Sequence, residues 1–303
     1  MQPMPTQARP KPSPLRIWWI AARPPTLPAA IVPVLVGAAL AWAGGRFLAL
    51  PFVATLLASL LIQIGTNLAN DVFDYEKGAD TAERLGPPRI TAAGWVAPAG
   101  VRRAMIGVFA AAAVLGVYLI AVGGWPILVV GVLSLICAVA YTGGPWPLGY
   151  HGLGEVFVFL FFGVVAVVGT FYVQTGTVTP LAFVASVPVG LLCTAIIVAN
   201  NIRDIDTDRQ AGKRTLAVRI GRTATRALYT ACIALPYGII VALWPLAGRT
   251  PLVLLPLLTL PLAVPLIQAI WREVAGPPLI AVLKGTGRLH MVFGVLFALG
   301  LLM

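Results

Sequence analysis

The chain has 303 residues, of which 59% are hydrophobic and only 10% are charged, and its formal net charge is +11. Soluble globular proteins carry roughly 25% charged residues, so this composition excludes an ordinary soluble domain and indicates a multi-pass membrane protein. The basic excess does not indicate a nucleic-acid partner, because no motif of interleaved aromatic and basic residues accompanies it.

The first predicted element is a Pro-rich, polar segment, residues 1–15, which we expect to be a disordered cytoplasmic tail. Residues 16–303 are expected to form a single transmembrane domain of the all-α class. Its apolar runs are continuous, and in lipid only helices can satisfy the backbone groups of such runs. Several runs reach the roughly 20 residues that span a bilayer, and the last run is short. The expected spans are 26–44, 50–70, 103–122, 125–142, 154–173, 181–200, 226–246, 250–270 and 287–303.

The basic residues predict how these spans are oriented. With nine spans, only Arg46 and Arg249 fall on one side of the membrane, and every other Lys and Arg falls on the opposite side together with all ten acidic residues. Lys and Arg concentrate in cytoplasmic loops. We therefore expect an integral plasma (inner) membrane protein whose N-terminus and acidic loops are cytoplasmic.

Eight of the ten carboxylates lie in two short stretches that follow the second and sixth spans. Acidic motif 1 covers residues 67–80, with Glu83 just beyond it, and acidic motif 2 covers residues 200–208; each begins with Asn-x3-Asp. The two motifs are four spans apart, so they end helices of the same orientation. This predicts a parallel pseudo-repeat of four-helix units, with the motifs facing each other across a central cavity. Inverted repeats would place them on opposite sides of the membrane.

Residues three and four apart share a helix face, so each motif forms one stripe of oxygen ligands. Carboxylate and amide oxygens without His or Cys suit Mg²⁺, which prefers one or two carboxylates together with water and substrate phosphates. The sequence therefore predicts Mg²⁺ between the stripes, with a diphosphate bridging them. The first stripe holds Asn67, Asp71 and Asp74, with Asn70 beside it, and the second holds Asn200, Asp204 and Asp208.

Basic residues are interleaved with these acids. They would repel the ion in a cation pore, whereas they suit a phosphate that is held partly by metal and partly by Arg. A solvated loop with capping Asn residues explains one such patch equally well, but two patches with the same frame favour a shared task. The basic residues are Lys77, Arg84, Arg89, Arg203, Arg209, Lys213 and Arg214.

The pattern Asn67-x3-Asp71-x2-Asp74, paired with Asp204-x3-Asp208, resembles the UbiA-type intramembrane prenyltransferase superfamily. Residues 22–29, 77–89 and 141–155 are similar to one branch of it, the 1,4-dihydroxy-2-naphthoate polyprenyltransferases of menaquinone synthesis. The resemblance extends from residue 17 to about residue 222, and the last three spans match only as apolar helices.

This resemblance implies about nine helices around a central cavity, two Mg²⁺ ions and a polyprenyl diphosphate donor. The implied reaction replaces the carboxylate of 1,4-dihydroxy-2-naphthoate with a prenyl chain and yields demethylmenaquinol, CO₂ and diphosphate. Metal binding falls to Asn67, Asp71, Asp74, Asp204 and Asp208, and catalysis to the four Asp together with Tyr141. Beyond what the resemblance implies, we expect the substrates to be bound by Asn67, Asn70, Lys77, Arg84, Arg89, Asn200, Arg203, Arg209, Lys213, His151, Glu155 and Arg23.

The acceptor side of the site is less specific. His151 and Glu155 lie one helical turn apart and can orient or deprotonate an acceptor hydroxyl, although an interfacial His beside a Glu favoured by a helix N-terminus explains them equally well. Aromatic faces can shield a carbocation, but packing is the better explanation for any single one. The alternatives that stay open are another aromatic acceptor, 4-hydroxybenzoate or homogentisate, and a cation transporter. The aromatic candidates are Tyr75, Tyr141, Tyr150, Phe157, Phe161 and Phe162.

Overall fold

The computed structural model describes residues 11–79, 86, 88–246, 251–272 and 277–302. Within these ranges every regular element is a helix, which confirms the predicted all-α class. Most of the expected N-terminal tail, residues 1–10, lies outside the described residues, and the first helix begins at Pro14.

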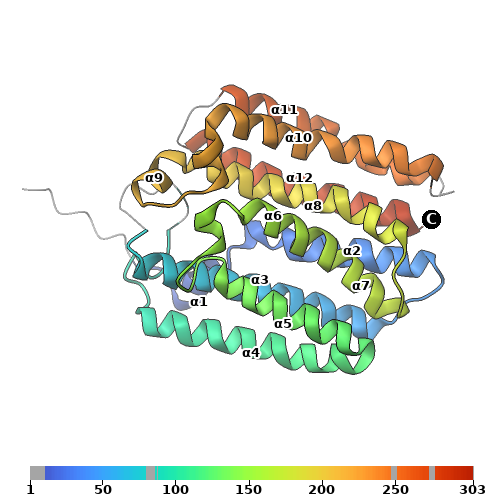
Figure 1. Ribbon diagram of the computed structural model, residues 1–303, viewed down its shortest axis with the longest axis horizontal. Helices are drawn as coiled ribbons and strands as arrows, with labels where there is room; N and C mark the ends of the chain where they lie inside the picture. Colours follow the sequence, from blue (N-terminus) through green and yellow to red (C-terminus); the bar gives the residue numbers. More distant parts are fainter. Residues whose placement is uncertain (1–10, 80–85, 87, 247–250, 273–276, 303) are drawn as a thin grey trace, which may run out of the picture.

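The helices run roughly side by side along the long axis of the molecule (Figure 1). In chain order they are α1 (Pro14–Ala22), η1 (Pro24–Thr26), α2 (Pro28–Ala43), α3 (Ala49–Glu76), α4 (Pro98–Gly123), α5 (Trp125–Ala140), η2 (Leu148–His151), α6 (Gly154–Val158), the π-helical η3 (Phe159–Val165), α7 (Ala166–Thr175), α8 (Pro180–Arg203), α9 (Ile205–Gln210), α10 (Leu216–Leu246), η4 (Pro251–Thr259), α11 (Leu260–Arg272) and α12 (Pro277–Leu302).

Seven helical segments among the described residues are long and apolar enough to cross a membrane. An eighth span is the pair formed by Pro14–Thr26 and Pro28–Ala43, which is bent by 53°. The apolar helix α5 is shorter, and it corresponds to the remaining predicted span. The predicted arrangement of about nine spans is therefore consistent with the fold, and the chain is a multi-pass membrane protein.

Two helix boundaries differ from the sequence prediction. α3 continues to Glu76 instead of ending near residue 70, and α12 begins at Pro277 instead of residue 287. At the end of α3 the helix continues beyond the apolar run, and its acidic side chains there have hydrogen-bond partners. At the start of α12 the helix begins before the expected span, and Lys284 and Arg288 are exposed on it.

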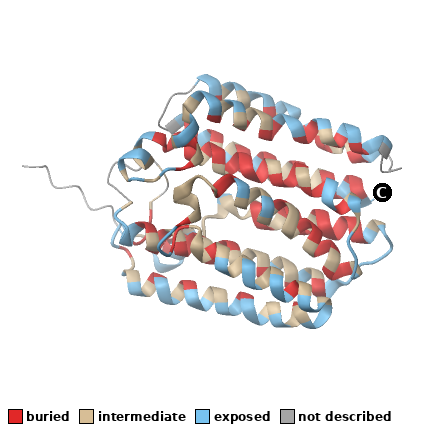
Figure 2. Cartoon of the chain, viewed as in Figure 1, coloured by how far each residue is buried: buried red, intermediate tan, exposed pale blue. Residues whose placement is uncertain are grey.

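The best-buried helices lie in the middle of the bundle. α2 and α8 are buried over most of their length and α12 over about half of it, while α4, α5 and α11 present many exposed positions (Figure 2). The main core packs Val32 and Val36 of α2 against Leu192 of α8 and Phe293 of α12. Large exposed apolar side chains such as those on α4 and α5 would be unfavourable in water, but they suit a surface that faces lipid.

The two acidic motifs lie at the same end of the bundle. α3 and α8 both point their C-terminal ends toward the end that carries α9, at the left of Figure 1. An ion pair between Asp74 of motif 1 and Lys213, which lies five residues after the end of motif 2, joins the two regions. This is the arrangement that a parallel repeat requires.

A close helix crossing holds η3 against α8. A Cβ atom added at Gly163 would lie 2.6 Å from the Cα of Gly190, a distance that backbone atoms cannot relieve cheaply. Glycine is therefore required at Gly163 because two helix backbones meet there, and this contact fixes one wall of the bundle.

We expect Gly163→Ala to lower the free energy of unfolding by about 1–3 kcal/mol, because the added methyl overpacks this crossing. Thermal unfolding of the purified protein in detergent micelles measures the change. The matched control is Gly107→Ala in α4, where nothing lies within 4 Å of the added Cβ. Equal stability of the two variants would contradict the close crossing.

Candidate functional site

A cavity of about 620 Å³ lies between the helices from α2 to α8. Its volume falls within the roughly 300–1,000 Å³ of small-molecule sites. One end is polar and carries both acidic motifs, and the walls contributed by α4, α5 and α7 are mostly apolar. The predicted cavity between the motifs is therefore present. The motif residues on its wall are Asn67, Asn70 and Asp74 from motif 1 and Asn200, Asp204 and Asp208 from motif 2.

Asp74 is buried at the polar end and accepts hydrogen bonds from three side chains. Arg89 Nη2 lies 2.6 Å from Oδ2, while the Tyr150 hydroxyl at 2.6 Å and Lys213 Nζ at 3.0 Å both reach Oδ1. Each donor comes from a different loop. This carboxylate therefore holds the loop after α3, the loop after α5 and the loop after α9 together.

Two ammonium groups lie close to the Tyr150 ring. Lys77 Nζ is 5.1 Å and Lys213 Nζ is 4.7 Å from its centroid. Lys77 Nζ also donates to the carbonyl oxygens of Thr142, at 2.6 Å, and Gly144, at 3.1 Å. Burial lowers the pKa of Lys77, Asp74 opposes this shift and Lys213 adds to it. Several cations therefore surround one carboxylate, and an anionic ligand would relieve the excess positive charge.

Arg203 holds the side chains of motif 2 in place from the side that faces away from the cavity. Its Nε and Nη2 donate to the two oxygens of Asp204 at 2.7 and 2.5 Å, and Nη2 also donates to Asn200 Oδ1 at 2.9 Å. The guanidinium is buried and does not line the cavity. Arg203 therefore orients two cavity oxygens, and its predicted contact with substrate stays a prediction.

Asp208 is the least compensated acid at this end. Its carboxylate makes no hydrogen bond or ion pair with the other described residues. Burial raises its pKa to about 7; Lys213 and Arg203 oppose the shift, while Asp204 and Asp74 add to it. A divalent cation nearby would favour the charged carboxylate.

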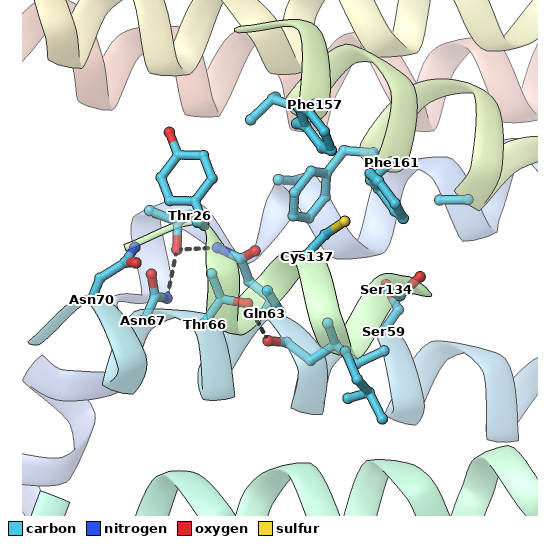
Figure 3. A pocket seen from close by; sticks show the side chains of 18 of the residues that line it. Thr26, Ser59, Gln63, Thr66, Asn67, Asn70, Ser134, Cys137, Phe157 and Phe161 are labelled. Atoms are coloured by element: carbon cyan, nitrogen blue, oxygen red, sulfur yellow. Dashed lines mark hydrogen bonds between the residues drawn. The ribbon is translucent and has the colours of Figure 1, made fainter. Parts of the chain in front are cut away.

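Asn67 is oriented by the corner between α1 and α2. Its Nδ2 donates to the carbonyl oxygen of Ala22 and to Thr26 Oγ1, each at 3.0 Å. Gln63 Nε2 donates to the same Thr26 oxygen at 3.0 Å (Figure 3). With its nitrogen bound in this way, the amide of Asn67 leaves its oxygen for the cavity.

Asp71 has a different role from Asp74 in this structure. Its two carboxylate oxygens accept the backbone N–H groups of Ile90 and Thr91, each at 3.0 Å, and the residue does not line the cavity. It thereby fixes the loop that places Arg89 on Asp74. Its predicted role as a metal ligand stays a prediction.

Tyr141 and Arg23 both line the cavity as well. Arg23 adopts a left-handed backbone conformation with φ 54°, and the hydroxyl of Thr26 donates to its carbonyl oxygen at 2.9 Å. Such a conformation costs energy in a residue with a side chain and is typical of functional positions. The Tyr141 hydroxyl forms no hydrogen bond with the other described residues, so it is available to a ligand.

Three further predicted residues, His151, Glu155 and Arg209, do not line the cavity. His151 stacks on Trp146 with ring centroids 4.1 Å apart, and Glu155 accepts a hydrogen bond from Asn201 at 2.9 Å. Arg209 is exposed and also off the cavity wall. Arg84 lies outside the described residues.

Sequence reasoning missed Gln63 and Thr26. Gln63 lies one helical turn before Asn67 in an otherwise apolar run. A polar amide at that position, on the same helix face as Asn67, could have indicated that Gln63 also faces the cavity. Thr26 offered none, because its contact with α3 joins residues far apart in the chain.

The donor set fits a hard divalent cation such as Mg²⁺. Among the described residues, no three His, Cys, Asp or Glu side chains are gathered closely enough to hold an ion alone. The cavity instead offers a few carboxylate and amide oxygens from two helix ends. Mg²⁺ usually completes so sparse a set with water and substrate phosphates.

Comparison with known proteins identifies the family. The sequence model described as the UbiA prenyltransferase family matches residues 30–278. The chain belongs to the UbiA prenyltransferase family. The resemblance predicted from the acidic motifs is confirmed.

Curated relatives carry the name of the predicted branch. The proteins named 1,4-dihydroxy-2-naphthoate octaprenyltransferase from Escherichia coli and Mycobacterium tuberculosis are 37% and 38% identical to this chain. The first match covers 94% of both chains, and the second covers 93% of this chain and 95% of the relative. The protein of the same name from Bacillus subtilis is 33% identical over 95% of this chain and 92% of its own length.

Solved structures show the same fold. A UbiA homolog from Archaeoglobus fulgidus bound to GPP and Mg²⁺ superposes with a TM-score of 0.69 at 14% identity, covering 94% of this chain and 99% of that chain. The apo UbiA homolog from Aeropyrum pernix K1 gives a TM-score of 0.69 at 17% identity, covering 90% and 96%. At these identities the likeness concerns the fold.

We expect Asp71→Asn to lower the free energy of unfolding by about 1–3 kcal/mol, because the new amide N–H group opposes a backbone donor at Ile90 or Thr91. Thermal unfolding in micelles and faster hydrogen exchange at those two amides would report it. Asp208→Asn is the control, and it should change stability by less than about 0.5 kcal/mol because its carboxylate has no partner to lose. The reverse order of stabilities would contradict the assignment of the two acids.

Proposed function

We propose that this protein transfers a polyprenyl group from polyprenyl diphosphate to 1,4-dihydroxy-2-naphthoate, with loss of CO₂, to give demethylmenaquinol and diphosphate. The observation that carries the proposal is a cavity with both acidic motifs and several cations at one end and apolar walls along the rest. Such a cavity suits a molecule with a charged head and a long apolar tail. The names of the relatives support the same donor and acceptor.

Motifs 1 and 2 would hold the cation that the diphosphate requires. Bound there, Mg²⁺ would supply positive charge to the leaving diphosphate. The residues that would hold it are Asn67 and Asp74 on one side and Asn200, Asp204 and Asp208 on the other. Two opposed patches suit two ions, and the A. fulgidus homolog binds Mg²⁺ together with a prenyl diphosphate.

The basic residues would take the remaining phosphate charge. Lys77, Arg89 and Lys213 are already placed around Asp74, within the network of short contacts described above. Because their positions are fixed before substrate arrives, little reorganisation is needed as charge grows on the leaving group. This preorganisation favours cleavage of the allylic C–O bond.

The acceptor ring then forms the new C–C bond. The ring carbon that bears the carboxylate attacks the allylic carbon, the C–O bond to diphosphate breaks, and loss of CO₂ restores aromaticity. Phe157 and Phe161 line the cavity with ring planes only 8° apart and centroids separated by 6.1 Å. Their faces and that of Tyr141 can shield positive charge on the allyl group from water.

We propose that this polar end lies at the cytoplasmic face of the plasma (inner) membrane, which the charge asymmetry of the sequence supports. Both substrates' charged groups would then enter from the cytoplasm, while the tail lies along the apolar helices. The clustered cations argue against a cation transporter, because they would repel an ion on its way through the cavity.

The test offers the purified protein a polyprenyl diphosphate with 1,4-dihydroxy-2-naphthoate, 4-hydroxybenzoate or homogentisate. We expect prenylated product and released CO₂ only with the naphthoate, and we expect EDTA to abolish turnover and added Mg²⁺ to restore it. Asp208→Asn should reduce turnover by about 100-fold or more, because a carboxylate that would hold the divalent cation on the leaving diphosphate is lost. Product with another acceptor instead, or full activity in EDTA, would contradict the proposal.

A further inference from the structure

Gln63 carries a buried oxygen that the network around Asn67 does not use. The residue lies on α3, one turn deeper in the cavity than Asn67, and is only 7% exposed. Its Oε1 is the only buried side-chain oxygen on the cavity wall that lacks a hydrogen-bond partner among the described residues. A buried acceptor without a hydrogen-bond donor lowers the stability of the protein by about 1–3 kcal/mol unless a ligand or water supplies the donor.

The orientation of the Gln63 amide is fixed by Thr26. The Thr26 hydroxyl donates its only proton to the Arg23 carbonyl oxygen, so its Oγ1 can only accept from Gln63 and Asn67. The amide nitrogens of both residues must therefore face Thr26. Figure 3 shows the Gln63 oxygen on the opposite side of the amide, toward Cys137 and Phe161.

The chemistry of the substrates decides which of them can satisfy this oxygen. A polyprenyl chain has no hydrogen-bond donor, and a diphosphate presents further acceptors. A hydroxylated aromatic ring has both a donor and an apolar face, and the wall near Gln63 offers Phe157 and Phe161 for that face (Figure 3). In 1,4-dihydroxy-2-naphthoate the 1-hydroxyl is engaged by the neighbouring carboxylate, so the 4-hydroxyl is the free donor.

We propose that Gln63 Oε1 accepts a hydrogen bond from the 4-hydroxyl of the aromatic acceptor and thereby makes α3 the specificity-determining wall for that substrate. This inference rests on the proposed function and adds a residue to its acceptor side. Asn67 and Gln63 lie one turn apart on the same helix, and their amide oxygens then serve different parts of the cavity. The oxygen of Asn67 faces the charged end, and the oxygen of Gln63 accepts the hydrogen bond from the acceptor hydroxyl.

A site built to hydrogen-bond a hydroxyl discriminates strongly against analogues that lack it, because the buried protein group is then left unpaired. The contact can therefore be measured as a ratio between two ligands. If Gln63 only held α3 against Thr26, its substitution would weaken the binding of both ligands equally and leave the ratio of their affinities unchanged.

The experiment uses the full-length protein in micelles and measures competitive inhibition against 1,4-dihydroxy-2-naphthoate. The inhibitors are 2-naphthoate, 1-hydroxy-2-naphthoate and 4-hydroxy-2-naphthoate. For the unsubstituted protein we expect 4-hydroxy-2-naphthoate to bind about tenfold more tightly than 2-naphthoate, as one satisfied hydrogen bond predicts. We expect Gln63→Met to reduce that ratio to within about twofold, with KM for the prenyl diphosphate unchanged.

The matched control is Gln174→Met. Gln174 is equally buried, but its amide is paired at both ends with the backbone of Leu48, and it does not line the cavity. It should keep the tenfold ratio of the unsubstituted protein. An unchanged ratio in Gln63→Met would overturn the inference, and so would a ratio near one in the unsubstituted protein, a result that needs no variant. Either outcome leaves prenyl transfer intact, whereas absence of turnover with every acceptor would remove the proposed function itself.

Discussion

The carboxylate of Asp74 is the point on which the polar end of this molecule depends. A buried charge is tolerated only when it is paired and hydrogen-bonded, and Arg89, Tyr150 and Lys213 meet that requirement from three different loops. Removing one partner of such a group is far more costly than an exposed ion pair would suggest. The network therefore does more than neutralise an acid, because it joins the loops of both halves of the repeat.

The two halves contribute differently to the cavity. Motif 1 is fixed by contacts with other segments, since Asp71 binds the backbone of residues 90 and 91 and Asn67 binds the α1–α2 corner. Motif 2 is braced locally by Arg203, and Asp208 is left without a partner. A cation placed between the halves would find rigid oxygen ligands on one side and an uncompensated carboxylate on the other. This asymmetry fits a site in which the carboxylate of Asp208 gains a partner only when a cation is bound.

Hydropathy predicted the class of fold and the number of spans, because the length of an apolar run is a local property of the chain. It misplaced the end of α3, where acidic residues with their own partners continue the helix, and the start of α12, where exposed basic residues interrupt the apolar pattern. The repeated Asn-x3-Asp frame predicted the shared cavity, because each frame is a short pattern in the sequence and both frames end helices of the same orientation. The roles of Asp71, His151 and Gln63 depend on contacts between distant segments, and spacing along the chain does not contain them.

The central claim is that both acidic motifs hold one diphosphate through divalent cations. Mn²⁺ in place of Mg²⁺, with a non-reacting thiolodiphosphate analogue of the donor, tests it by electron–nuclear double resonance. The account predicts a ³¹P coupling that shows direct Mn²⁺–phosphate coordination and that is lost in Asp74→Asn and also in Asp208→Asn. Retention of the full coupling when either motif is disabled would contradict the account, because a single helix end would then suffice to hold the ligand.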